Sequence, residues 1–398
     1  MDITIIPGKL SGSVTAIPSK SQAHRLLICA AFADAPTLLH CPETNRDIEA
    51  TAGCLNALGA DIVRTETGYE VTPVSQLPER AVLNCHDSGS TLRFMLPLAG
   101  ALGVDTTFLL EGRLPQRPLS PLWEEMERMG CSLSRPTADT IRCQGQLRAG
   151  EYTIDGSISS QFITGLLLAA SRIHGVSRIQ LTGKVESKPY ITMTQRAMAL
   201  FGLDTSDFIV KGGRPYLSPG ELTVEGDWSN GAFFLAATAL GNDVLTENLS
   251  PDSPQGDRAA AELLSALEQN VTISAADIPD LVPILSVVAA CKQGAVFTDI
   301  QRLRLKESDR VASVIAMLKN LGGHAEATED TLTVYPTGLV GGTVDSVNDH
   351  RIAMSAAIAA TVCKDPVTIL GAECVKKSYP HFWTEYARLG GSYEQYLR

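Results

Sequence analysis

Several common functional signatures are missing from this sequence. No uninterrupted apolar run of about 18 residues is present, and the first residues lack the basic and apolar segments of a secretory signal peptide. Neither the GxxxxGK(S/T) nor the GxGxxG pattern occurs, so the two common glycine-rich cradles for nucleotide phosphates are not indicated. We therefore expect a cytoplasmic protein without membrane contacts.

Paired cysteines and an excess of positive charge are also missing. The nine cysteines are scattered from Cys29 to Cys374 without a C-x-x-C pair, which indicates neither a disulfide framework nor a zinc ribbon, so we expect small buried side chains. The net charge of -11 disfavours nucleic acid as a partner, because nucleic-acid binding relies on cationic contacts to phosphates. Any anion site in this chain must therefore be local.

The composition that remains is typical of a globular α/β enzyme. Hydrophobic residues make up 44% of the chain, charged residues 19% and aromatic residues only 6%, which suits a core packed from aliphatic side chains. With 398 residues, the chain exceeds what one hydrophobic core usually supports, so we expect two domains.

A Leu-rich helix that ends at glycine recurs along the chain. Glycine, and next best asparagine, adopts the left-handed backbone conformation that ends a helix. The copies end at Gly59, Gly130, Gly202, Gly322 and Gly390, and Asn270 is counted as a sixth. Hairpin signals follow some copies, with turns at residues 67–68 and 329–330. Units of roughly 50 to 70 residues are too long for a solenoid repeat and suit a small βαβ module with a hairpin.

Small polar residues precede several apolar helices. They occur at residues 87–91, 159–161, 227–230 and 348–350. Each segment fits a helix N-cap, and the free N–H groups at a helix start also attract phosphate or carboxylate. Taken singly, each segment is more often only a cap.

Some helix starts also carry positive charge. Residues 306–310 are expected to open a helix that ends near Leu321, with Lys306 and Arg310 on one face because they are four residues apart. A solvated charged first turn explains this segment equally well. Residues 348–351 place a cation and a titratable imidazole at a helix start, where positive charge opposes the helix dipole. An anionic ligand would relieve this, and residues 18–25 have the same character. Arg93, Arg117 and Lys377 are further candidates, with surface solvation as their default explanation.

Ten short motifs follow one another along essentially the whole chain. They are PSKSxxxR, DSGSTxR, RPL, SSQF, SKPYI, GDWS, IPD, LKESDR, NDHR and KSYP. In this order and spacing they resemble the motifs of the 5-enolpyruvylshikimate-3-phosphate synthase family. One such motif would carry little weight, whereas ten in family order leave little room for coincidence.

The resemblance implies a fold and an activity. The fold would be a two-domain inside-out α/β barrel of the enolpyruvyl transferase type, with three βαβαββ-type units in each domain and helix N-termini directed into the cleft between the domains. Residues 1–14 and 224–398 would form one domain and residues 15–223 the other. The activity would be transfer of the enolpyruvyl group of phosphoenolpyruvate to the 5-hydroxyl of shikimate-3-phosphate, with release of phosphate. Neither a metal nor an organic cofactor is implied, the two substrates are the expected partners, and we expect a monomer.

The resemblance also assigns residues to the substrates. The positions that match the shikimate-3-phosphate site are Lys20, Ser21, Arg25, Ser159, Ser160, Gln161, Ser187, Tyr190, Asp280 and Lys306. The positions that match the phosphoenolpyruvate site are Lys20, Gly89, Arg117, Gln161, Arg310, His350, Arg351 and Lys377. Hydroxyl and amide groups suit phosphate oxygens and ring hydroxyls, and several cations suit a phosphate next to a carboxylate.

Three residues are candidates for catalysis by the same resemblance. Asp280 would be the base toward the substrate hydroxyl, Glu307 the acid and base at C3 of the enolpyruvyl group, and Lys20 would stabilise charge on oxygen and assist proton transfer. Cations ordinarily lower the pKa of a carboxylate, so Glu307 acts as an acid only if burial or substrate charge opposes them. The alternative for Asp280 is a helix cap, because the apolar residues 281–290 follow it.

Two positions depart from the family pattern, and a third bears on inhibition. Asp87 stands where many relatives have Asn, and Arg302 where some do, so Asp87 is expected to be chiefly a cap. Gly89 is retained, and a larger side chain there would crowd the enolpyruvyl site. Sensitivity to glyphosate, the phosphonate inhibitor of the family, is therefore a hypothesis.

Two other functions fit part of the pattern. The enolpyruvyl transferase that acts on UDP-N-acetylglucosamine shares the repeat fold, but it usually relies on a reactive loop cysteine and lacks the combination of SSQF, SKPYI and NDHR. A non-catalytic anion-binding protein of the same architecture would need cations but no paired carboxylates. The presence of Lys20, Asp280 and Glu307 together disfavours that second alternative.

Overall fold

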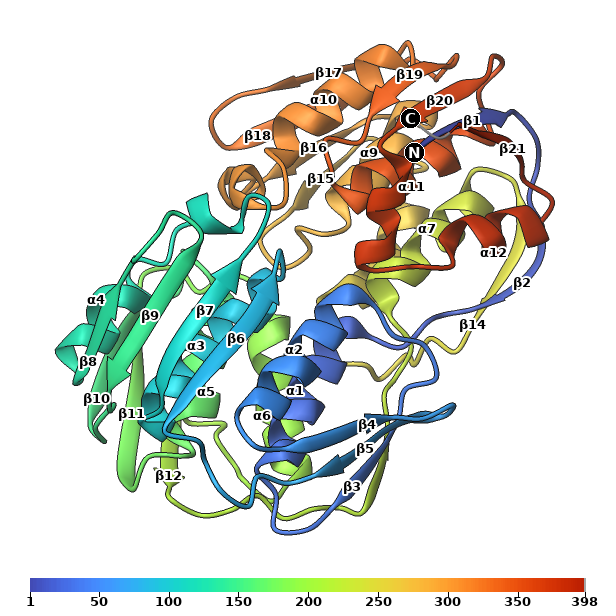
Figure 1. Ribbon diagram of the computed structural model, residues 1–398. Helices are drawn as coiled ribbons and strands as arrows, with labels where there is room; N and C mark the ends of the chain where they lie inside the picture. The colour runs from blue at the N-terminus through green and yellow to red at the C-terminus, as the bar shows by residue number, and fades with distance from the viewer. Residues whose placement is uncertain (397–398) are drawn as a thin grey trace. The chain divides into compact units, whose positions relative to one another are not determined.

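The computed structural model describes residues 1–396, and Figure 1 shows their mixed α/β fold. The chain separates into two compact units. We call Met1–Ile17 together with Glu225 onward the first unit, and Pro18–Val224 the second unit. The second unit is an insertion, because the chain leaves the first unit after Ile17 and returns to it at Glu225.

The second unit contains three mixed sheets of one pattern. One has the strand order β13 (Glu221–Thr223), β3 (Thr37–His40), β5 (Gly68–Thr72) and β4 (Asp61–Arg64). Another has the order β6 (Arg80–His86), β7 (Asp105–Leu110), β9 (Thr140–Gly145) and β8 (Cys131–Ser134). The third has the order β10 (Glu151–Asp155), β11 (Gly175–Thr182) and β12 (Ile209–Gly212). Each sheet combines one parallel pair with antiparallel neighbours.

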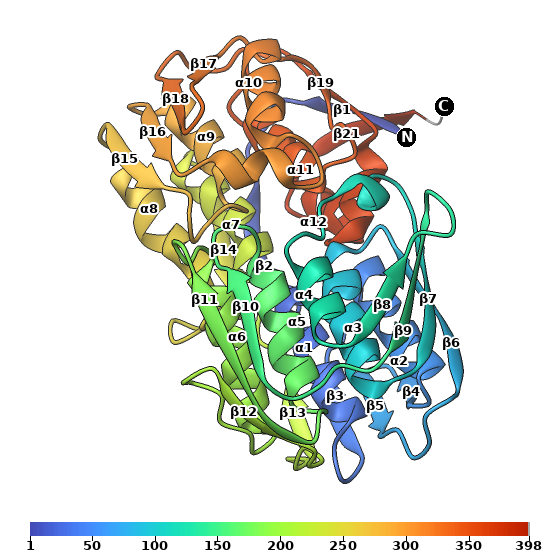
Figure 2. The same cartoon turned by 90° about the vertical axis from the view of Figure 1, so that its left-hand side faces the viewer.

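The helices of the second unit lie between and beside its sheets, as Figure 2 shows. They are α1 (Lys20–Ala31), α2 (Arg46–Ala57), α3 (Gly89–Leu102), α4 (Leu122–Arg128), α5 (Ser160–Ala170) and α6 (Lys188–Leu200), with a 3-10 turn at Leu114–Gln116. Helices α3 and α5 pack against each other, and nearly all of their side chains are buried, because they are apolar on all sides. Helix α1 packs against α2 and α6. In α3 and α5 the polar residues, which include Thr91, Arg93 and Thr164, lie within the first five residues of each helix.

The first unit also contains three sheets. In the smallest, β14 (Asp243–Glu247) pairs in parallel with β2 (Ser11–Thr15). The second has the order β15 (Val271–Ser274), β16 (Ala295–Thr298), β18 (Thr331–Tyr335) and β17 (His324–Ala327). The third has the order β19 (Gly342–Asp345), β20 (Val367–Leu370), β1 (Asp2–Ile6) and β21 (Ser392–Tyr396). Strand β1 is antiparallel to both of its neighbours.

Three helices of the first unit pack against one another, as Figure 1 shows: α7 (Trp228–Ala239), α9 (Val282–Cys291) and α11 (His350–Ala360). Every residue of α11 is buried, and α9 is buried from Val282 to Ala290. The remaining elements are α8 (Ala260–Ala266), α10 (Arg310–Asn320), α12 (Phe382–Arg388) and the 3-10 turns Gly256–Ala259, Gln301–Leu305 and Ala372–Lys377. The core of this unit is thus helical, with its sheets around it.

The predicted helix ends are confirmed at the five glycines but not at Asn270. All five glycines have positive φ, from 79° at Gly202 to 118° at Gly130. Hairpins follow two of them as predicted, since β4 pairs with β5 and β17 with β18. Asn270 is not among the described residues with positive φ, and the following β15 pairs in parallel with β16. The prediction for Asn270 was wrong because α8 ends earlier, with Leu267 as its C-cap in a right-handed conformation.

The predicted helix starts are largely confirmed. Side chains of Ser88, Ser159, Asp227 and Asp349 cap α3, α5, α7 and α11 by accepting hydrogen bonds from backbone N–H groups. Asp87 was wrongly expected to be the cap of α3, since Ser88 takes that position. The helix expected to open within residues 306–310 begins only at Arg310, because Asp309 caps it. Lys306 therefore does not share a helical face with Arg310.

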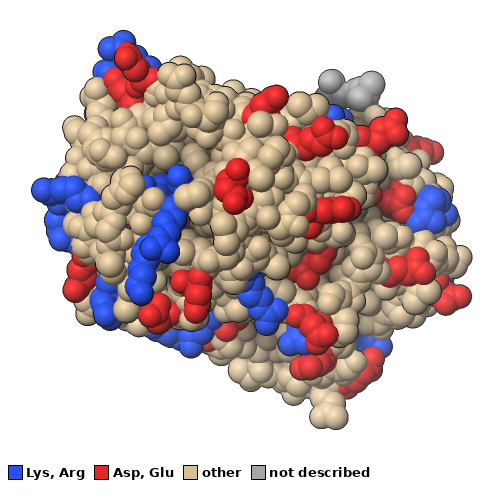
Figure 3. Space-filling view, turned by 90° about the horizontal axis from the view of Figure 1, so that it is seen from below, with Lys and Arg blue, Asp and Glu red and all other residues tan. Residues whose placement is uncertain are grey.

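The cysteines are buried as predicted, except that Cys291 is only partly covered. Within residues 1–396, no helix is both long and apolar enough to cross a membrane. The face of the molecule in Figure 3 carries basic as well as acidic side chains, so the net negative charge does not form a continuous acidic surface there.

Candidate active site

The candidate residues of the second unit gather at helix starts. Lys20 is the first residue of α1, Gly89 is the first of α3, Ser160 is the first of α5, and Ser187 directly precedes α6. The first N–H groups of a helix lack intrahelical acceptors and lie at the positive end of the helix dipole. Four such starts in one unit favour the binding of an anion.

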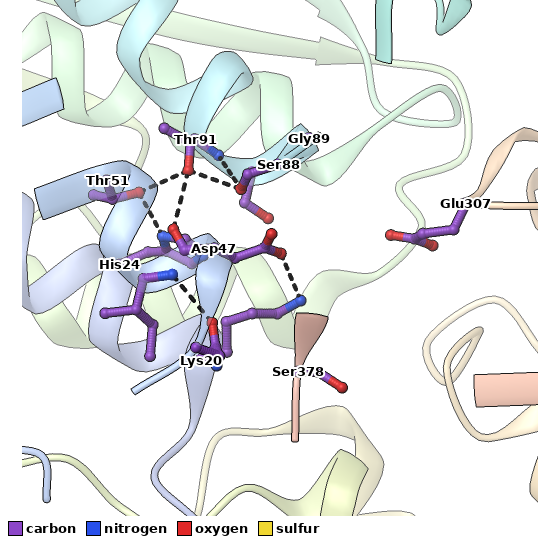
Figure 4. A network of polar contacts seen from close by, with 12 residues as sticks. Lys20, His24, Asp47, Thr51, Ser88, Gly89, Thr91, Glu307 and Ser378 are labelled. Carbon is purple, nitrogen blue, oxygen red and sulfur yellow. Dashed lines mark hydrogen bonds and ion pairs between the residues drawn. The ribbon is translucent and has the colours of Figure 1, made fainter. Parts of the chain in front are cut away.

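Lys20 is held by a carboxylate from the neighbouring helix. Its Nζ lies 2.9 Å from Oδ2 of Asp47 on α2, as Figure 4 shows. The side chain of Asp47 is 4% exposed and that of Lys20 is 15% exposed, so water screens this pair little. The carboxylate therefore fixes the direction in which the ammonium group points.

A buried hydrogen-bond network connects α1, α2 and α3 behind Lys20 (Figure 4). Nδ1 of His24 lies 2.7 Å from the Thr51 hydroxyl, which lies 2.8 Å from the Thr91 hydroxyl. The Thr91 hydroxyl in turn lies 2.8 Å from that of Ser88, the cap of α3. Burial lowers the pKa of His24 to about 3, so its imidazole is neutral at physiological pH. The network thus fixes the cap directly before Gly89.

Two arginines surround Gly89. A Cβ atom added to Gly89 would lie 2.6 Å from Nη1 of Arg117 and 2.8 Å from Nη1 of Arg93. Arg93 is buried, contrary to the default of surface solvation, and its Nη2 donates to the carbonyl of Pro118, 3.1 Å away. Nε of Arg117 is buried and has no hydrogen-bond partner among residues 1–396. A buried donor beside free helix N–H groups is suited to an anionic ligand.

Arg25 is buried and already engaged by the protein. Its Nε donates to Thr194 at 2.8 Å, its Nη1 donates to the carbonyl of Ser21, and its Nη2 donates to Thr164 and to the carbonyl of Tyr190 at 3.3 and 3.1 Å. The guanidinium thereby connects α1 with α5 and α6. The structure brings Arg25, Ser21 and Tyr190 together, as the prediction of a shared site requires.

The start of α5 is connected to that of α3. The Ser159 hydroxyl accepts from the N–H of Gln161 at 3.3 Å, and the Gln161 amide donates to the Ser90 hydroxyl at 3.0 Å. Ser160 and Ser187 are both buried. Ser187 has φ of 55°, a left-handed conformation that costs a non-glycine residue about 1 kcal/mol and is concentrated at functional sites.

In the first unit, the guanidinium of Arg310 binds three carboxylates. It donates to Asp280 through Nη1, to Glu307 through Nη2 at 2.7 Å and to Asp349 through Nε at 3.0 Å. Asp349 also accepts from the Ser308 hydroxyl at 2.9 Å. Arg310 is 1% exposed, and this surrounding negative charge raises its pKa against the effect of burial. Asp280 and Glu307 are thus brought together by one buried cation.

Asp280 lies among three cations and does not cap α9. Besides Arg310, it is approached by Nη2 of Arg351 at 3.4 Å and by Nζ of Lys306 at 3.8 Å. Burial alone would raise the pKa of Asp280, but these cations outweigh it and hold the pKa well below its usual value. The first residue of α9 is Val282 and its N-cap is Leu281, so the alternative that Asp280 is a helix cap is wrong.

The other predicted residues of the first unit are mostly buried. Lys306 precedes α10 in an extended conformation, and burial lowers its pKa to about 8. His350 and Arg351 are the first two residues of α11 and are 2% and 4% exposed. Lys377 ends a 3-10 turn and is 8% exposed. Buried positive charge is costly unless it is paired, and an anionic substrate would add to the pairing that Asp280 already gives Lys306 and Arg351.

Sequence reasoning did not single out Asp47, Thr51 or Asp257, which contact or electrostatically influence the candidate residues and their network. Asp47 is 27 residues from Lys20, and no periodic pattern connects the two. Asp257 lies in a 3-10 turn whose sequence gives no charge pattern. His24, Ser88 and Thr91 lie inside recognised motifs, so only their motif membership could have indicated them.

Comparisons with known proteins agree with this chemistry. A sequence model of the family described as EPSP synthase (3-phosphoshikimate 1-carboxyvinyltransferase) matches residues 5–386. The chain is 36% identical over 430 residues to the 3-phosphoshikimate 1-carboxyvinyltransferase of Clostridium beijerinckii, with 99% of each protein covered. It is 35% identical over 431 residues to the protein of the same name from Clostridioides difficile, with 99% of this chain and 98% of that one covered. In fold it is similar to the EPSP synthase of Acinetobacter baumannii, with a TM-score of 0.80, 24% identity, and 99% and 100% of the two chains covered.

Proposed function

The chain belongs to the EPSP synthase family, and from this premise we infer that it transfers the enolpyruvyl (1-carboxyvinyl) group of phosphoenolpyruvate to the 5-hydroxyl of shikimate-3-phosphate. It is a transferase of the shikimate pathway, which leads to chorismate and the aromatic amino acids, and its family is the target of glyphosate.

One observation in the structure supports catalysis in particular: Asp280 and Glu307 both bind the guanidinium of Arg310. A protein that only binds anions needs cations and gains nothing from two carboxylates among them. A group transfer that adds and removes protons needs acid and base groups, and carboxylates next to cations can supply them.

We propose that the two compact units correspond to the domains expected from the sequence, residues 1–14 with 224–398 and residues 15–223. In this proposal each domain is built from three βαβαββ-type units, and the whole is an inside-out α/β barrel. The three sheets found in each unit support it.

Shikimate-3-phosphate is assigned chiefly to the second unit. The proposed residues are Lys20, Ser21, Arg25, Ser159, Ser160, Gln161, Ser187 and Tyr190, with Asp280 and Lys306 from the first unit. The hydroxyl groups at the starts of α5 and α6 support this assignment, since they can donate to phosphate and accept from ring hydroxyls. Because most donors of Arg25 are engaged by the protein, we expect Arg25 to act largely by holding Ser21 and Tyr190.

Phosphoenolpyruvate is assigned to the cations. The proposed residues are Lys20, Gly89, Arg117 and Gln161 of the second unit and Arg310, His350, Arg351 and Lys377 of the first unit. The buried Nε of Arg117 and the open backbone at Gly89 support a phosphate or carboxylate at the start of α3. Guanidinium groups suit such anions because they donate two parallel hydrogen bonds.

The proposed reaction proceeds by addition and elimination. Asp280 removes the proton of the 5-hydroxyl while the oxygen of that hydroxyl bonds to C2 of the enolpyruvyl group. C3 accepts a proton from Glu307 or Lys20. The tetrahedral intermediate then loses phosphate from C2 and a proton from C3, which regenerates the double bond. The low pKa of Asp280 in the free protein makes it a weak base. The negative charge of both bound substrates opposes the surrounding cations and raises this basicity.

The test is a phosphate-release assay with both substrates. Phosphate should appear only when phosphoenolpyruvate and shikimate-3-phosphate are present together, and the rate should persist in EDTA, since no metal is expected. UDP-N-acetylglucosamine, added as an alternative acceptor, should neither replace shikimate-3-phosphate nor inhibit the release of phosphate. Phosphate release with that acceptor instead would assign the chain to the sister reaction, and release with neither acceptor would reject catalysis.

A further inference from the structure

A buried carboxylate, Asp257, lies beside the catalytic candidates of the first unit and has no role in the reaction above. It lies in the 3-10 turn Gly256–Ala259 and is 2% exposed. Oδ2 of Asp257 accepts a hydrogen bond from the Ser229 hydroxyl, whereas Oδ1 is buried without a hydrogen-bond partner in the described part of the chain. An unsatisfied buried polar atom destabilises the fold, so its presence calls for a reason other than stability.

Two further contacts connect Asp257 with Asp280. The carbonyl oxygen of Ser229 accepts a hydrogen bond from Nη1 of Arg351 at 3.2 Å. Nη2 of the same guanidinium donates to Oδ2 of Asp280 at 3.4 Å. Ser229 is the second residue of α7. The contact with Asp257 therefore holds the start of α7 in the position in which the Ser229 carbonyl accepts from Arg351.

We propose that Asp257 is a positioning residue for enolpyruvyl transfer: by fixing Ser229 it holds Arg351 in the orientation that contacts Asp280 and binds phosphoenolpyruvate. This inference rests on the proposed function, because it explains how a substrate-binding arginine of that reaction is oriented. Asp257 itself touches no substrate in this proposal.

The charge of Asp257 adds a second effect. Burial raises the pKa of Asp257 to about 7, and the negative charges of Asp280 and Asp227 act in the same direction, against Arg351 and the Ser229 hydroxyl. Below this pH the neutral carboxyl of Asp257 does not attract Arg351, so the guanidinium interacts with Asp280 and the substrate. Above it the carboxylate competes for Arg351, so binding of phosphoenolpyruvate should weaken as the pH rises through about 7.

The experiment compares the wild-type chain with Asp257→Ala and Asp257→Asn. For Asp257→Ala we expect KM for phosphoenolpyruvate to rise about 10-fold while KM for shikimate-3-phosphate changes less than about 2-fold. Asp257→Asn keeps the shape and cannot ionise, so it should retain the wild-type KM at pH 6 and lose the weakening near pH 7. Asp252→Ala, an exposed acid of the same loop, is the matched control and should match wild type.

The connection through Ser229 is tested by a double-mutant cycle. Ser229→Ala should raise the same KM, and the double variant Asp257→Ala with Ser229→Ala should be no worse than the more affected single variant, because both act on one chain of contacts. Wild-type KM for phosphoenolpyruvate in folded Asp257→Ala, or an equal rise in both KM values, overturns the proposal. If Asp257→Ala does not fold, a wild-type KM for phosphoenolpyruvate in Ser229→Ala overturns it. The phosphate-release activity of the wild-type chain tests the proposed function independently of these variants.

Discussion

Nζ of Lys20 lies 2.9 Å from Oδ2 of Asp47, a residue 27 positions away on the neighbouring helix. Lys20 is a candidate for both substrate binding and proton transfer. It is the first residue of α1, so the backbone is helical on its C-terminal side only. The buried carboxylate of Asp47 therefore supplies the orientation that the helix start alone does not. Catalysis by a lysine depends on this orientation, because a displacement of about 1 Å can cost about 100-fold in rate.

Removal of this carboxylate should impair turnover more than folding. We expect Asp47→Ala to lower kcat about 10- to 100-fold, because the ammonium group of Lys20 loses its fixed partner. Asp47→Asn, which keeps a hydrogen-bond acceptor without charge, should lie between this variant and wild type. Phosphate release measures kcat, and circular dichroism checks folding. Asp61→Ala, an exposed acid on β4, is the control; a kcat for Asp47→Ala within twofold of that control would remove Asp47 from the mechanism.

Asp280→Ala and Glu307→Ala should each fold and lose turnover. Arg310 keeps two of its three carboxylate partners in either variant, so its charge remains compensated. Loss of a positioned acid or base typically costs roughly 100- to 10,000-fold, and we expect kcat to fall at least that far. Single-turnover phosphate release and thermal unfolding are the measurements, with the exposed Glu329→Ala as control. Near-full activity in either variant would exclude that carboxylate as acid or base.

Gly89→Ala should weaken the binding of both phosphoenolpyruvate and glyphosate. The added methyl group meets Nη1 of Arg117 at 2.6 Å and Nη1 of Arg93 at 2.8 Å, so at least one guanidinium must move. We expect KM for phosphoenolpyruvate to rise about 10-fold, with a larger rise in the glyphosate inhibition constant and little change for shikimate-3-phosphate. Gly53→Ala is the matched control, because no atom other than those of its chain neighbours and its own helix backbone lies within 4 Å of its added Cβ. It should leave kinetics unchanged and stabilise α2 by about 0.5–1 kcal/mol.

The buried imidazole of His24 should make the second unit sensitive to acid. Burial lowers the pKa of His24 in the folded chain to about 3, below its value of 6.5 in the unfolded chain. The unfolded chain therefore binds more protons between these pH values, and the free energy of unfolding decreases by about 1.4 kcal/mol per pH unit as the pH falls from about 6.5 toward 3.

His24→Asn should remove this slope while keeping a hydrogen bond to Thr51. Urea unfolding of both proteins at pH 7, 6 and 5 gives the comparison, in which the titration of all other groups is shared. Equal pH slopes for the two proteins would show that His24 does not stay neutral in the folded chain.

Much of the fold could be predicted because helix ends are a local property. The five glycines adopt positive φ where the sequence predicted it, and Ser88, Ser159 and Asp349 cap the predicted helices. These features depend on backbone conformations that few residue types adopt. Asn270 was mistaken because asparagine also occurs in ordinary turns, so its presence does not locate a helix end.

The candidate site was harder to predict because its contacts are not periodic. Spacing placed Lys306 and Arg310 on one helical face, yet Lys306 precedes the helix and meets Asp280 from an extended segment. The partners of Lys20 and Arg351, namely Asp47 and the carbonyl of Ser229, come from other helices. Only the tertiary packing of whole helices determines such neighbours.

The position of β1 between β20 and β21 determines when the first unit can complete its folding during synthesis on the ribosome. Ile3 pairs with Ile369 on one side and with Gln395 on the other, so the earliest strand to be synthesised must wait for the last two. The inserted unit, whose strands pair only with one another, has all of its partners long before. A nascent chain stalled before residue 367 would thus carry a complete inserted unit next to an N-terminal strand with both edges open. Such open edges invite aggregation, so translation speed and chaperone access should govern the yield of active enzyme.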